Sequence, residues 1–99
     1  MTYRNQHLTM LAAGQSCVSC GANDGTIVWA HSNLMEHGKG KSIKSHDAAG
    51  MLLCFRCHSE LDQGKNMSRD ERREFIFTMI VRTHMRLWEL GLVEVVRCR

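Results

Sequence analysis

Two Cys-x-x-Cys pairs, Cys17/Cys20 and Cys54/Cys57, constrain the fold of this 99-residue chain more than any other feature. Four thiolates complete the tetrahedral shell of a structural zinc ion, and two such pairs in so short a chain are a strong signal for a Cys₄ site. The pairs are separated by residues 21–53, a longer interval than the roughly 15–20 residues of a common zinc ribbon. We therefore expect Zn²⁺ to join two distant segments, with disulfides or simple buried thiols as the alternatives, and the insert between the pairs to have its own function.

The run Cys54-Phe-Arg-Cys57-His58 also has the spacing of a c-type haem attachment site. Covalent haem attachment follows export, and the N-terminal segment lacks the charged and then apolar layout of a signal peptide. No apolar run reaches the roughly 20 residues that span a bilayer. We therefore expect a cytoplasmic protein without a membrane partner, in which thiols stay reduced and paired cysteines indicate metal rather than haem. Cys98 is expected to be an ordinary free thiol.

The composition is that of one globular domain, residues 1–99. Hydrophobic residues make up 43% of the chain and charged residues 23%, and cores divide into domains only in much longer chains. The formal net charge of +3 falls to about +1 once four thiolates bind one Zn²⁺. So small a charge does not establish nucleic-acid binding, which then depends on local clusters of basic residues.

The local patterns predict an α+β chain. The last helix has the strongest pattern, because Ser68 and Glu71 form a capping box and apolar residues then recur at helical spacing. Its arginines could face DNA, although pairing with acids one turn away is the simpler interpretation. The expected elements are a helix at 4–13, turns at 17–25, a strand at 26–32, an exposed loop at 33–47, a strand at 49–54, a helix at 54–64, a helix at 68–91 and a short strand at 92–96.

His58 and Asp62 are four residues apart and lie on one face of the predicted helix. His58 directly follows Cys57, and its direction on a helix differs from that of the cysteine by about 100°. The cysteine can therefore face zinc while the His58–Asp62 pair faces a second divalent ion; a metal-free surface pair is the alternative. His31 ends the strand inside the insert and is the natural companion of this pair, unless it is a satisfied core histidine.

The motifs C-x-x-C, TIVWAHS and LLCFRCHSELD together resemble the HNH, or His-Me finger, nucleases, in which a hairpin and a helix hold one metal ion. The chain is more closely similar to the small prophage-encoded nucleases of the YbcO type, which are similar in turn to a RecA-dependent phage nuclease. Their pattern is a zinc knuckle, a strand ending in Ala-His, a Gly-x-Gly-x-Lys loop followed by Asp, and Cys-x-x-Cys-His with Asp four residues on. The matching residues are Cys17/Cys20, Ala30-His31, Gly38-Lys39-Gly40-Lys41 with Asp47, Cys54/Cys57-His58, and Asp62.

The resemblance implies a small zinc-stapled ββα-metal domain (15–64) with a flanking N-terminal helix and a long C-terminal helix (68–91). It implies a metal-dependent DNA endonuclease with His31 as general base and Mg²⁺ or Mn²⁺ on His58 and Asp62. It further implies a role in phage recombination or DNA processing, with RecA or another recombination protein as a partner. The residues expected to contact DNA phosphates are Lys39, Lys41, Lys44 and Arg56.

Two departures from the HNH pattern bear on activity. These enzymes usually place Asp or His directly before the first histidine as a metal ligand, and this chain has Ala30. The middle Asn that orients the first histidine is also not visible, and Asp47 or a backbone carbonyl could replace it. The alternative function is accordingly a non-catalytic zinc-binding DNA-binding or protein-adaptor domain that kept the fold and lost a ligand.

Overall fold

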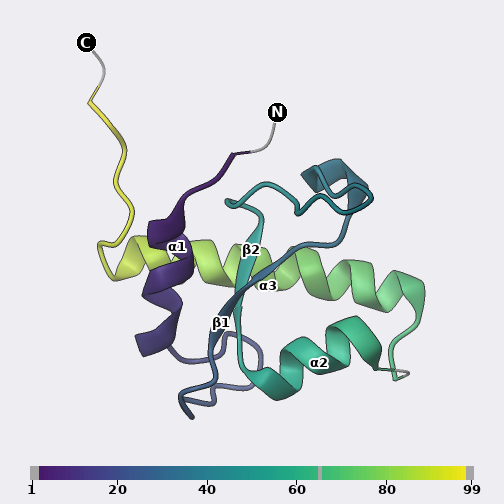
Figure 1. Ribbon diagram of the computed structural model, residues 1–99. Helices are drawn as coiled ribbons and strands as arrows, with labels where there is room; N and C mark the ends of the chain where they lie inside the picture. Colours follow the sequence, from purple (N-terminus) through teal and green to yellow (C-terminus); the bar gives the residue numbers. More distant parts are fainter. Residues whose placement is uncertain (1–2, 65, 98–99) are drawn as a thin grey trace.

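The two strands form an antiparallel hairpin at the centre of the computed structural model, which describes residues 3–64 and 66–97 (Figure 1). Strand β1 (Val28–His31) pairs with β2 (Gly50–Leu53), so that Val28 lies opposite Leu53 and His31 opposite Gly50. The two predicted strands are thus confirmed in shorter form. A side chain on Gly50 would collide with the indole of Trp29, which explains the absence of a Cβ at this position.

Three α-helices surround the hairpin, giving a small α+β fold. Asn5 caps the first of them by accepting from the backbone N–H of His7, so the helix predicted at 4–13 begins after this residue. Two short 3₁₀ turns complete the regular structure. The helical elements are α1 (Gln6–Leu11), η1 (Ala12–Gly14), η2 (Met35–His37), α2 (Phe55–Gln63) and α3 (Arg69–Glu89).

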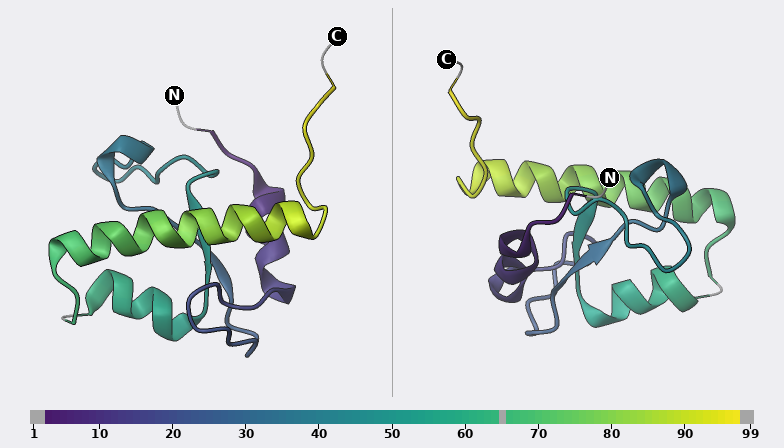
Figure 2. Two further views of the ribbon diagram at one scale, coloured as in Figure 1. Left: turned by 180° about the vertical axis from the view of Figure 1, so that it is seen from behind. Right: turned by 45° about the horizontal axis from the view of Figure 1, so that its top comes forward.

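Helix α3 runs along the whole molecule on one side of the hairpin, the side that faces the viewer in the left view of Figure 2. The predicted capping box of Ser68 and Glu71 is present, and Gly91 adopts a left-handed conformation just past the helix end, with φ of 70°. The helix buries Ile76, Met79, Thr83 and Leu87, in agreement with the predicted periodicity. It also provides a hydrogen-bond acceptor for the outer edge of β2, because the Thr83 hydroxyl accepts a 3.1 Å hydrogen bond from the Leu52 N–H.

The arginines of α3 mostly bind loop carbonyls, so the expected pairing with acids one turn away does not describe them. Arg72 donates to the Gly64 carbonyl, Arg82 to that of Val18 and Arg86 to that of Ser16. Arg73 pairs with Glu36 of the insert rather than with an acid of its own helix. These contacts fasten the first cysteine segment and the insert to the long helix.

Two expectations from sequence are wrong. The segment 33–47 is not uniformly exposed, since Ser45 and Asp47 are 0% and 3% accessible; both are held against the N-terminal segment, where Arg4 donates to the Ser45 carbonyl. Residues 92–96 form no strand within the described part of the chain. Leu92 instead donates its N–H to the Leu87 carbonyl and closes helix α3. Val93 packs against the core, and the segment after it extends away from the body (Figure 1).

Across residues 3–64 and 66–97, none of the helices combines the length and the apolar character that a membrane span requires.

Candidate functional site

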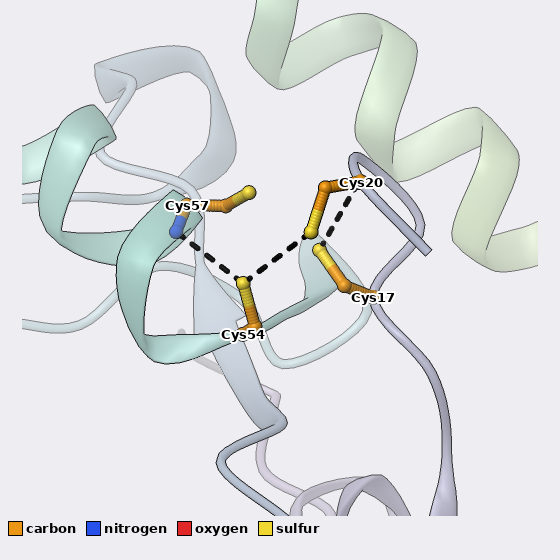
Figure 3. A group of neighbouring side chains, drawn as sticks. All are labelled: Cys17, Cys20, Cys54 and Cys57. Atoms are coloured by element: carbon orange, nitrogen blue, oxygen red, sulfur yellow. Dashed lines mark hydrogen bonds between the residues drawn. The ribbon is translucent and has the colours of Figure 1, made fainter. Parts of the chain in front are cut away.

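The four paired cysteines meet at one end of the hairpin (Figure 3). Cys17 and Cys20 come from the turn before β1, while Cys54 and Cys57 come from the start of α2. Their sulfurs all lie within 4.8 Å of one another, and the Sγ atoms of Cys20 and Cys54 are 3.6 Å apart. A tetrahedral zinc ion with Zn–S bonds of about 2.3 Å holds its sulfurs about 3.8 Å apart. The four thiols are free and far too distant for a disulfide bond of about 2 Å, so the cluster fits a metal such as zinc.

Backbone hydrogen bonds orient the sulfurs. The Cys54 sulfur caps α2 by accepting from the Cys57 N–H at 3.5 Å. In the first pair, the Cys17 sulfur accepts from the N–H groups of Ser19 and Cys20 at 3.4 and 3.5 Å. Such donors favour thiolates, the form that binds metal.

The thiols differ in their tendency to ionise. A hydrogen bond with the Ala22 backbone, aided by the Cys54 thiol, lowers the pKa of Cys20 to about 7, while burial raises the pKa of Cys57 to about 12. One thiolate is thus favoured, and further thiolates beside it need a cation. Arg56 interacts with the Cys20 sulfur, which raises the pKa of the guanidinium.

His31 forms a pair with a buried carboxylate at the other end of the hairpin. Its Nε2 lies 2.7 Å from Oδ1 of Asp47. Oδ1 also accepts a hydrogen bond from Arg4, and Oδ2 accepts one from the Asn5 backbone N–H. Burial disfavours the Asp47 carboxylate, but the Asn5 N–H, the His31 ring and the Arg4 charge outweigh it and keep its pKa below the ordinary value. An ionised Asp47 takes the Nε2 proton as its hydrogen bond, which leaves the lone pair on Nδ1.

His58 and Asp62 lie one turn apart on α2, with Nε2 and Oδ2 separated by 3.0 Å. They line a pocket of about 350 Å³ together with His31, and we call this space the histidine pocket. The further polar residues that line it and enter the argument are Lys39, Lys44 and Ser45. Three separate segments, namely the end of β1, the insert and α2, thus contribute to one space.

The metal-binding capacity of the two sites differs. Among the described residues, only the cysteines form a group of three or more possible ligands. His58 and Asp62 would offer a second ion one nitrogen and one carboxylate oxygen. Their side chains are 36% and 46% exposed, which leaves room for water or phosphate oxygens in a Mg²⁺ or Mn²⁺ shell.

The basic residues predicted to contact phosphates are not gathered in one place. Lys39 and Lys44 line the histidine pocket, whereas Lys41 and Arg56 do not. Sequence reasoning did not identify Ser45, whose buried hydroxyl has no hydrogen-bond partner in the described structure. Nothing in the local pattern marks this serine. Asp47 is part of the motif expected from the resemblance and a possible replacement for the missing Asn, and the structure pairs its carboxylate with the His31 ring.

Fold and site define a small α+β protein with a four-cysteine cluster that could hold a metal ion such as zinc. Residues 6–92 match the sequence model of the family described as "Putative nuclease YbcO", and the chain belongs to this family. The family name implies a nucleic acid as substrate. No curated protein and no solved structure gives a significant match to the chain.

Proposed function

We propose that the protein is a metal-dependent endonuclease that hydrolyses phosphodiester bonds in DNA. The observation that carries this proposal is the histidine pocket, where the Asp47-bound His31 and the His58–Asp62 pair line the same space. The succession of β1, β2 and α2, of which β1 and α2 line this pocket, supports a ββα arrangement of the His-Me finger type. Membership of the YbcO family supports the reaction class.

His31 would act as the general base. Its Nδ1 carries the lone pair, because Asp47 takes the Nε2 hydrogen bond, and a neutral imidazole is suited to accept a proton from water near neutral pH. The water oxygen then forms a bond to phosphorus, the bond from phosphorus to the 3′ oxygen breaks, and the 3′ oxygen takes up a proton from solvent. Lys39 and Lys44 would hold the phosphate by charge without reading the base sequence.

His58 and Asp62 would hold Mg²⁺ or Mn²⁺, which supplies charge stabilisation to the phosphate oxygens when bound. Ala30, which precedes His31, offers no ligand, and its side chain is buried. The absence of a metal ligand at this position favours the alternative function, a zinc-binding DNA or protein adaptor without catalysis. The two functions differ in one measurable respect, namely whether the zinc-loaded protein cuts DNA.

The test is nicking of supercoiled plasmid with Mg²⁺ or Mn²⁺. We expect wild-type protein to nick, and we expect His31→Ala to lose roughly 10²- to 10⁴-fold in rate because the base is absent. Asp47→Asn should lose a comparable factor, since the amide no longer fixes the ring tautomer. His7→Ala, which changes an exposed histidine of α1, is the matched control and should nick normally. An active His31→Ala protein would show that the base is wrongly assigned.

The same proposal includes the setting in which the protein acts. The protein would be a cytoplasmic member of the HNH superfamily, of prophage origin, that acts with RecA or another recombination protein. The nicking assay therefore includes an arm with RecA and single-stranded DNA. Wild-type protein that nicks with neither metal, with or without RecA, supports the adaptor function instead.

A further inference from the structure

A second hollow lies on the opposite side of the insert from the histidine pocket, facing α3 rather than α2. It consists of two neighbouring pockets of about 460 and 310 Å³ that share His46, Ala48 and His84 along their boundary. Its walls are the insert, the C-terminal half of α3 and the N-terminal segment. We call it the ring groove, because six of its lining side chains carry aromatic or imidazole rings: Tyr3, Trp29, His37, His46, His84 and Trp88.

Two of these rings are substantially exposed. Tyr3 is 43% exposed and stacks on His46, with ring centroids 4.8 Å apart and planes at 21°. Trp88 is 54% exposed and lies at an angle beside His84. Such large exposed rings at the wall of a groove provide flat surfaces on which a further ring can stack.

The charges along the groove are compatible with an anionic chain. Within the described residues, Glu36 is the single acid that lines it, and this carboxylate is paired with Arg73. Trp29 lines both the groove and the histidine pocket and lies between the two spaces. Trp29 donates through Nε1 to the Asp47 carbonyl at 2.7 Å, so this ring is fixed relative to the proposed base.

We propose that the ring groove binds unpaired bases of the DNA strand whose phosphate enters the histidine pocket. The choice of DNA rests on the proposed function, whereas the preference for unpaired bases rests on the rings. Bases in a duplex are stacked and paired and cannot enter a groove of this kind, while bases of a single strand stack on aromatic side chains regardless of sequence. The protein then prefers DNA with a single-stranded region at or beside the cut.

The test measures binding rather than cutting, with the zinc-loaded protein and no added Mg²⁺ or Mn²⁺. Fluorescence anisotropy compares a labelled oligothymidylate with a duplex of the same length. We expect tighter binding of the single strand, and we expect Trp88→Ala and Tyr3→Ala each to weaken it by about 5- to 150-fold, the loss of one stacked base. Phe55→Ala is the matched control, since Phe55 is 70% exposed on α2 and outside the groove.

The outcomes separate this inference from the proposed function. Loss of binding in the Trp88 and Tyr3 variants but not in Phe55→Ala supports the ring groove even if no plasmid is nicked. Equal affinity for both DNAs, or unchanged binding in the two groove variants, overturns it even if the protein is an active nuclease. Self-association of the wild type that Trp88→Ala abolishes in sedimentation also overturns it, because a second copy would then cover the groove.

Discussion

Asp47 links the histidine pocket to the N-terminal segment. One carboxylate oxygen contacts His31 and Arg4, the other accepts from the Asn5 backbone, and the Asp47 N–H donates to the Tyr3 carbonyl. These partners make ionised Asp47 a stabilising group, because its pKa lies below the ordinary value in the folded protein. That contribution is complete above the unfolded pKa of about 3.9 and is lost as the pH falls through the lower folded value. The carboxylate is thus fully ionised at the neutral pH where His31 would act.

Ser45 presents the opposite case, a buried hydroxyl without a hydrogen-bond partner in the described structure. An unsatisfied buried polar group lowers the stability of the fold by about 1–3 kcal/mol, so we expect the Ser45 hydroxyl to bind a ligand rather than to stabilise the fold. Ser45 lines the histidine pocket beside Lys39 and Lys44, where its O–H could donate a hydrogen bond to a phosphate oxygen.

We therefore predict that Ser45→Ala raises the melting temperature by a few degrees and weakens nicking about tenfold, chiefly through KM. Calorimetry and initial nicking rates measure the two effects. Ser59→Ala on α2 is the matched control and should change neither. A lower melting temperature in Ser45→Ala would mean that the hydroxyl has a structural partner, such as an ordered water, and no role in binding.

At the scale of elements, the first cysteine pair is held in place by β2 and α3. Val18 donates its N–H to the Leu52 carbonyl at 2.9 Å, and Arg82 and Arg86 donate to the carbonyls of Val18 and Ser16. The turn that contains Cys17 and Cys20 has no regular structure of its own, so these contacts fix its position relative to Cys54 and Cys57.

We predict that Arg86→Met lowers the melting temperature and accelerates zinc release to a chelator. A hydrogen bond from a charged donor contributes about 1.5–3 kcal/mol, and methionine keeps the apolar stem of the arginine while removing this donor. Arg69→Met, an exposed change in the first turn of α3, is the control. Zinc release at the wild-type rate from Arg86→Met would contradict the proposed tether.

The elements with local signals were predictable, and those that depend on distant partners were not. The capping box and apolar spacing define α3 to within two residues at its C-terminal end, and the cysteine spacing predicts the cluster. The burial of Asp47 depends on Arg4 and Asn5, more than forty positions away, and a polar, glycine-rich segment gives no sign of it. The sequence also could not show that Arg56 interacts with Cys20, because a side chain in the first turn of a helix can face either the cysteines or a bound phosphate.

At the scale of the whole molecule, we expect metal binding at the cysteine cluster to decide whether the chain folds. The hairpin and α3 form a small core, and the two cysteine pairs are joined only through residues 21–53 in the unfolded chain. Structural zinc sites contribute about 10–16 kcal/mol, which is as large as the whole net stability of a typical domain, about 5–15 kcal/mol. Folding and zinc binding are therefore expected to be one coupled reaction.

We predict one Zn²⁺ per chain by elemental analysis, and loss of both the helical circular dichroism signal and the cooperative melting transition when a strong chelator removes it. Cys57→Ser should reproduce this loss, because three remaining thiolates bind zinc much more weakly than four. Cys98→Ser is the control; Cys98 lies outside the described residues, and its substitution should leave zinc content and melting temperature unchanged. If Cys57→Ser melts at the wild-type temperature, the cysteine cluster is not the structural centre of the fold. Contacts other than the metal would then have to hold α2, and with it His58, near His31.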